Sequence, residues 1–173
     1  MNRKAKHRES PAQRSGHATV EVAPFSRVVG LGYNDGPTEG VAESVDHTTC
    51  YRFQLLDELP DWDEGNDLRV FSLAALPPGS LDSLLHVCPG SEHATSPVWV
   101  PIWKFDSTAA QETTEREVQR ILNSAAPPDG VVATDASLTT VIARRSVTGE
   151  DLRRVDDWLG FVGLARPRSA DHA

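Results

Sequence analysis

Residues 49–56 read TCYRFQLL and residues 68–74 read LRVFSLA, and these two stretches decide the fold class. Large apolar residues occupy every second position from Tyr51 to Leu55, which is the pattern of a half-buried strand. The later stretch is also rich in residues that favour strands. The segment between them is polar and has a Gly-Asn pair near its end that suits a hairpin turn. We therefore expect two antiparallel strands joined by a loop over residues 57–67.

The same reasoning predicts strands on both sides of this pair. Upstream, Asn34-Asp35-Gly36-Pro37 is a strong turn signal, because Asn, Asp and Gly tolerate positive φ and Pro fixes its own φ. Downstream, Pro101 lies within an aromatic segment. Since Pro101 cannot donate a ladder hydrogen bond, that strand is expected at a sheet edge or with a bulge. The further strands are expected at residues 26–33, 38–45, 98–105, 130–134 and 138–144.

Start signals predict three helices. A short helix follows Ser80, and a second helix carries the capping-box spacing of Thr114 and Glu117, with a start as early as Thr108. The third helix opens after Thr148. Consecutive strands at short spacing imply antiparallel hairpins, so the element order favours an α+β fold. We expect a mainly antiparallel sheet with three helices packed on one face.

The length of 173 residues is that of one ordinary domain, which we place at residues 18–165. Residues 1–17 are basic and contain no large apolar residue after Met1, so we expect a disordered tail, with a second one at residues 166–173. The body between the tails carries ten Lys or Arg against 23 Asp or Glu, and the whole chain has a net charge of −8. Such a body repels phosphate and attracts cationic partners, so no nucleic acid is expected on it.

The sequence also indicates a compartment. It contains no run of 18 apolar residues and no apolar stretch after the basic N-terminus, so we expect neither a membrane span nor a secretory signal. We therefore expect a cytoplasmic protein that does not bind membranes. Its two cysteines, Cys50 and Cys88, are expected to be reduced thiols there.

Several enzyme motifs are missing from the chain. Gly30-Leu31-Gly32 follows a strand, but no helix opens after it to receive a dinucleotide pyrophosphate. There is no P-loop and no G-x-S-x-G nucleophile elbow. Asp61-x-Asp63-x-Gly65 resembles a calcium loop only in part, because Gly65 stands where an oxygen ligand is needed. We expect a non-enzymatic protein without a cofactor.

A zinc site is the main alternative. Zinc is held by four imidazole or thiolate ligands, and two pairs close in sequence could supply them. The spacing of the pairs is not a standard one, and the other interpretation is two buried thiols with histidines in water. The candidate metal ligands are His47, Cys50, His86, Cys88 and His93.

The strongest feature of the chain that could bind a partner is acidic. Residues 57–67 contain six Asp or Glu and no basic residue. Trp62 lies among them, and Trp is a common anchor of interfaces. We expect a binding or regulatory module that neutralises a basic partner protein, such as a nuclease-type toxin. An enzyme with a carboxylate-lined pocket stays open as a further alternative, because such pairs assemble in space and leave no local spacing. The expected partner-binding residues are Asp61, Trp62, Asp63, Glu64 and Asp67.

Overall fold

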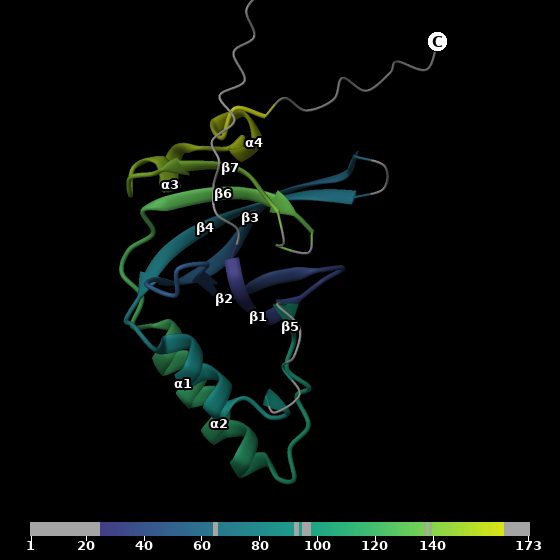
Figure 1. The fold of residues 1–173 in the computed structure, drawn as a ribbon, viewed down its shortest axis with the longest axis vertical. Coiled ribbons are helices and arrows are strands. Elements are labelled where there is room, and N and C mark those ends of the chain that lie inside the picture. Colours follow the sequence, from purple (N-terminus) through teal and green to yellow (C-terminus); the bar gives the residue numbers. More distant parts are fainter. Residues whose placement is uncertain are drawn as a thin grey trace, which may run out of the picture.

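The computed structural model describes residues 25–63, 66–91, 94, 98–136, 138 and 140–164, and it has a mixed α+β fold dominated by strands (Figure 1). The strands are β1 (Phe25–Tyr33), β2 (Pro37–Ser44), β3 (Cys50–Asp63), β4 (Asn66–Leu76), β5 (Val98–Trp99), β6 (Gly130–Asp135) and β7 (Val141–Ser146). The helices are α1 (Ser80–Val87), α2 (Thr108–Leu122), α3 (Asp151–Arg154) and α4 (Trp158–Phe161). Both expected tails, and the expected start of the domain at residue 18, lie outside the described residues.

The seven strands form a single sheet in the order β5-β1-β2-β3-β4-β6-β7. Neighbouring strands run antiparallel, except that β5 is parallel to β1. The four N-terminal strands are therefore consecutive hairpins, as the closely spaced strand patterns predict. In the described part of the chain, no helix has the length and apolar character that a membrane crossing requires.

The sheet is strongly curved. Arg144 on β7 donates a hydrogen bond to Tyr51 on β3, at 3.4 Å, although β7 and β3 are three positions apart in the sheet. Strands lie about 4.8 Å apart, so three positions would separate these strands by roughly 14 Å in a flat sheet. Bulges at the start and end of β1 and after Leu55 in β3 increase the local twist and help the sheet to curl.

The two faces of the sheet are covered differently. Leu68, Val70 and Leu76 of β4 point to one face, which we call the outer face, because they pack against helices. Leu76 belongs to the cluster with α1 and α2, whereas Leu68 and Val70 belong to the cluster with α4. Figure 1 shows α1 and α2 at one end of the sheet and α3 and α4 at the other. The opposite, inner face is packed by strand residues such as Phe53 and Phe71, whose rings meet edge to face at 5.3 Å.

Three elements differ from the sequence expectation. The segment 57–67 was expected to be a loop, but β3 and β4 extend through it to Asp63 and from Asn66. The strand expected at 98–105 ends at Trp99, although it does lie at the sheet edge. The expected third helix is divided into α3 and α4, because Val155 is extended and Asp157 caps a new helix through a hydrogen bond from the Gly160 N–H.

A buried arginine fixes the turn between β1 and β2. Arg69, on the inner face of β4, is 1% exposed and donates to the carbonyl oxygens of Asn34, at 2.9 Å, and Pro37, at 3.1 Å. The Glu58 carboxylate lies 3.7 Å from its Nη2. Gly36 of this turn has a φ of 147°, and a Cβ added there would lie 2.6 Å from Arg69 Nη1. Gly36 therefore supplies both a backbone angle that other residues avoid and the space that the guanidinium fills.

Candidate functional site

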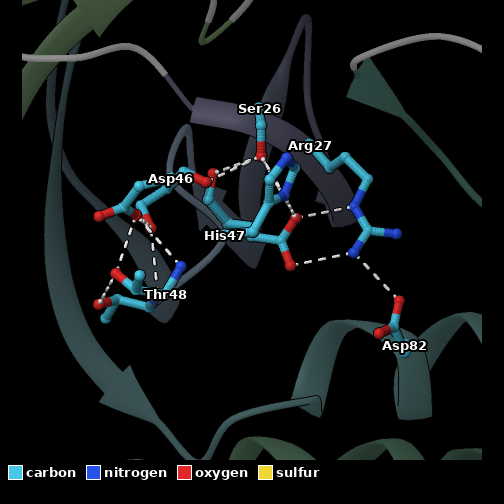
Figure 2. A network of polar contacts seen from close by, with 9 residues as sticks. Ser26, Arg27, Asp46, His47, Thr48 and Asp82 are labelled. Carbon is cyan, nitrogen blue, oxygen red and sulfur yellow. Dashed lines mark hydrogen bonds and ion pairs between the residues drawn. The ribbon is translucent and has the colours of Figure 1, made fainter.

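A group of polar side chains gathers where β1, β2 and α1 meet (Figure 2). We call it the Glu43 network, and its members are Ser26, Arg27, Glu43, His47 and Asp82. Glu43 is 6% exposed and lies on the outer face of β2. Since a buried carboxylate is stable only when it is paired and hydrogen-bonded, this network is the first place to look for chemistry.

The core of the network is a cross-strand ion pair. The antiparallel register places Arg27 directly opposite Glu43. The guanidinium makes two hydrogen bonds to the carboxylate, from Nε to Oε2 at 2.9 Å and from Nη2 to Oε1 at 3.0 Å. Nη2 also donates to Asp82 Oδ1 on α1, at 3.0 Å. Arg27 thus joins the outer face of the sheet to the helix that packs on it.

This pairing determines the charge state of Glu43. The hydrogen bond from Arg27 is the largest influence and lowers the pKa of the Glu43 carboxyl to about 2. Burial acts in the opposite direction, and the contact with His47 lowers the pKa further. The hydrogen bond to Glu43, and after it the one to Asp82, raise the pKa of the Arg27 guanidinium against the effect of burial. Glu43 therefore stays ionised at any physiological pH and is unsuited to exchange protons there.

Ser26, His47 and Glu43 together resemble a nucleophilic triad, but the contacts are wrong for one. His47 Nδ1 lies 2.6 Å from Glu43 Oε2 and 3.5 Å from Ser26 Oγ, so one ring nitrogen faces both groups. A triad needs the acid on one nitrogen and the hydroxyl on the other. The Ser26 hydroxyl instead donates to the Ser44 carbonyl, at 2.9 Å. The arrangement therefore anchors the chain and does not activate a nucleophile.

The turn between β2 and β3 is held by its own side chains (Figure 2). His47 has a φ of 57°, in the left-handed region. Asp46 Oδ1 accepts hydrogen bonds from the Ser44 hydroxyl, at 2.6 Å, and from the backbone N–H and hydroxyl of Thr48, at 3.1 and 2.9 Å. These bonds, the one from Ser44 first, lower the pKa of the Asp46 carboxyl. Together with the Glu43 network they fix the turn in one conformation.

The described candidate zinc ligands have separate structural roles. Cys50 and Cys88 are buried in the cluster that joins the sheet to α1 and α2, and burial raises the pKa of the Cys88 thiol to about 11. His86 is exposed on α1, and His47 is paired with Glu43. His93 lies outside the described residues. Among the residues that the structure describes, no three His, Cys, Asp or Glu side chains are grouped so as to hold a metal ion.

The acidic segment belongs to the far half of the long β3–β4 hairpin. Asp61 and Asp63 lie on β3 and Asp67 lies on β4, whereas Glu64 lies outside the described residues. In Figure 1 the described arms of this hairpin run past the end of β6. Trp62 is half-buried, because it packs against the cluster of α4. Trp62 thus contributes to the fold. The sequence analysis had considered it only as an interface anchor.

His47 was singled out from the sequence only as a candidate zinc ligand, and Arg69 and the other residues of the Glu43 network were not singled out at all. Arg27 and Glu43 are separated by 16 positions, and Arg27 and Asp82 by 55. The signal that could have found the first pair is the turn at residues 34–37, since it fixes the register of β1 against β2. No comparable signal links Arg27 to α1.

Comparisons with known proteins give no relative for this chain. No protein-family model, no curated protein and no solved structure matches it. A function for this chain is therefore inferred from its residues and their geometry alone.

Proposed function

We propose that this protein is a non-catalytic binding module whose β3–β4 hairpin docks a basic protein. The observation that carries the proposal is the position of the acids. Five of the six acids of segment 57–67 lie on the two strands of one hairpin, which extends past its neighbour β6. A concentrated negative surface speeds the approach of a cationic partner and excludes partners of like charge.

The surroundings of the hairpin support this proposal. Arg69 lies 3.7 Å from the Glu58 carboxylate, but it is buried and already donates to two backbone carbonyls, so it neutralises Glu58 only in part. Trp62 and Leu59 pack towards α4, which ties the acidic part of the hairpin to the core. A tethered surface loses less conformational entropy when it binds than a loose loop does.

The test is a pull-down with the full chain as bait, at about 50 mM and about 500 mM salt. High salt screens exposed charges and so weakens the contacts between them. We expect one basic protein to bind directly at low salt and to be lost at high salt. The hairpin variant combines Asp61→Asn, Asp63→Asn and Glu64→Gln. We expect its affinity for the purified partner to fall about tenfold, since each exposed ion pair contributes up to about 1 kcal/mol.

A matched control separates the hairpin from net charge. Asp106→Asn, Glu112→Gln and Glu115→Gln remove the same charge from exposed positions on and beside α2. The control variant should bind as the wild type does. Recovery of no basic partner, or an equal loss of affinity in the hairpin and control variants, would contradict docking through the hairpin.

A further inference from the structure

An open pocket lies at one end of the inner face, away from the acidic hairpin. It has a volume of about 380 Å³, which is at the lower end of the range for small-molecule sites. We call it the Tyr51 pocket. Its walls include the rings of Phe25 and Tyr51, the Val45 side chain, and the polar residues Asp46, Thr48 and Arg144.

The cation of this pocket is Arg144. Side chains alternate along β7, so Arg144 faces the inner side opposite Val132, whereas Arg145 faces α4 and donates to the Phe161 carbonyl. The Arg144 guanidinium lies over the Tyr51 ring, 5.4 Å from its centroid, and makes one long hydrogen bond of 3.4 Å to the Tyr51 hydroxyl. No carboxylate of the described residues forms an ion pair with it. Most of its five N–H donors are therefore available to an anion.

The rest of the pocket restricts what that anion can be. Phe25 and Tyr51 meet edge to face, with centroids 6.4 Å apart, and both are partly buried. Val45 is 45% exposed, which leaves apolar surface open to a ligand. Asp46 is held ionised by the hydrogen bonds of its turn, and its negative charge disfavours ligands with several negative charges, such as phosphates.

We propose that the Tyr51 pocket binds a small organic carboxylate with an aromatic or branched aliphatic body. The carboxylate pairs with the Arg144 guanidinium, which matches its geometry in a bidentate manner. The apolar body lies against Phe25, Tyr51 and Val45. The site needs no acid of the hairpin, so it goes beyond the proposed docking function and does not depend on it.

The test titrates the full chain with 1-naphthoate by calorimetry, with the neutral 1-naphthamide and inorganic phosphate as comparison ligands. We expect 1-naphthoate to bind with a Kd below about 1 mM, and 1-naphthamide and phosphate to bind at least about tenfold more weakly. Arg144→Gln should weaken 1-naphthoate at least about tenfold. Arg153→Gln, which removes the same charge from an exposed position of α3, should leave its binding unchanged.

A second variant tests the apolar wall separately from the charge. Val45→Trp fills the pocket from its rim and should abolish 1-naphthoate binding, while thermal unfolding shows that the fold is kept. Equal binding of the acid and the amide, equal binding by wild type and Arg144→Gln, or no binding of 1-naphthoate up to about 5 mM would each overturn the proposal. If Arg144→Gln does not fold, the comparison of acid and amide on the wild type and on Val45→Trp still decides it.

Discussion

Two turns of this sheet are each held by a buried charged residue, but in opposite ways. At the β2–β3 turn, Glu43 is ionised and its two oxygens are bonded by Arg27, with His47 beside it. At the β1–β2 turn, Arg69 is bonded to two backbone carbonyls, and its Nε has no hydrogen-bond partner within the described ranges. One turn is thus held by a balanced ion pair and the other by a cation that lacks full compensation.

The two turns differ in which polar groups are left without a partner when Glu43 or Arg69 is removed. The partners of Glu43 reach solvent, because the side chains of Arg27 and His47 are 39% and 62% exposed. Of the two carbonyls that Arg69 bonds, the one on Pro37 belongs to a buried residue, and its hydrogen bond is buried as well. A buried group left without its partner costs more than one that water can reach, so the turn held by Arg69 is the more vulnerable.

Arg69→Met is therefore expected to have the largest effect. It removes both hydrogen bonds to the turn, including the buried one to the Pro37 carbonyl, so we expect a loss of about 3 kcal/mol in the free energy of unfolding. Denaturant unfolding monitored by far-ultraviolet circular dichroism measures this loss. Arg120→Met on α2 is the control, because Arg120 is exposed and pairs only with Glu117 among the described residues, and it should cost less than about 0.5 kcal/mol. A similar loss in both variants would contradict the special role of Arg69.

Gly36→Ala tests the same turn from the backbone side. Its φ of 147° is unfavourable for alanine, and the added methyl would meet the Arg69 guanidinium. We expect a loss of about 2 kcal/mol, measured by denaturant unfolding as above. The double variant with Arg69→Met should lose less than the sum of the two single losses, because the clash disappears with the guanidinium. Strict additivity would indicate that Gly36 does not serve Arg69.

Glu43→Gln should cost less than either change at the first turn. The amide keeps one acceptor oxygen for Arg27, and Arg27 and His47 can turn to water. We expect a loss of about 1–2 kcal/mol at neutral pH. A loss larger than that of Arg69→Met would reverse the ranking of the two turns.

The pH dependence of Glu43→Gln sharpens this comparison. The pKa of Glu43 in the folded chain, about 2, is below its ordinary value of 4.5. The ionised group therefore stabilises the fold above pH 4.5, and this contribution is lost as the pH falls towards about 2. The difference in unfolding free energy between wild type and Glu43→Gln should shrink over that window. A difference that does not depend on pH over this window would contradict the assigned pKa.

The sequence predicted the hairpin strands because their signals are local. The alternation from Tyr51 to Leu55 and the turn at 34–37 depend on near neighbours, and the structure confirms the strands there. Beyond Leu55 the pattern fails, since a bulge after this residue shifts the register and Leu56, Leu59 and Trp62 pack on the outer face at a spacing that is not two. A segment rich in acids and without alternation predicts a loop, yet pairing with β4 makes it a strand.

The Glu43 network could not be predicted in the same way. The ion pair between Arg27 and Glu43 exists only after β1 and β2 are in register, and Asp82 joins it only after α1 packs on the sheet. The spacing of the candidate zinc ligands likewise did not show that Cys50 lies on the face that packs against α1. The sheet thus positions charged residues and thiols that are far apart in sequence. Their spacing in the sequence alone does not show which of them come together.

Asp82→Asn is expected to have the smallest effect, and it defines where the Glu43 network ends. The Asp82 side chain is 69% exposed, so its ion pair with Arg27 is screened by water and salt. We expect a loss below about 0.5 kcal/mol, and a double-mutant cycle with Arg27→Gln should give a coupling of the same size. A coupling above about 1 kcal/mol would mean that Arg27 stabilises the docking of α1 as strongly as the β2–β3 turn. A small coupling would instead mean that Arg27 stabilises the fold mainly through its ion pair with the buried Glu43.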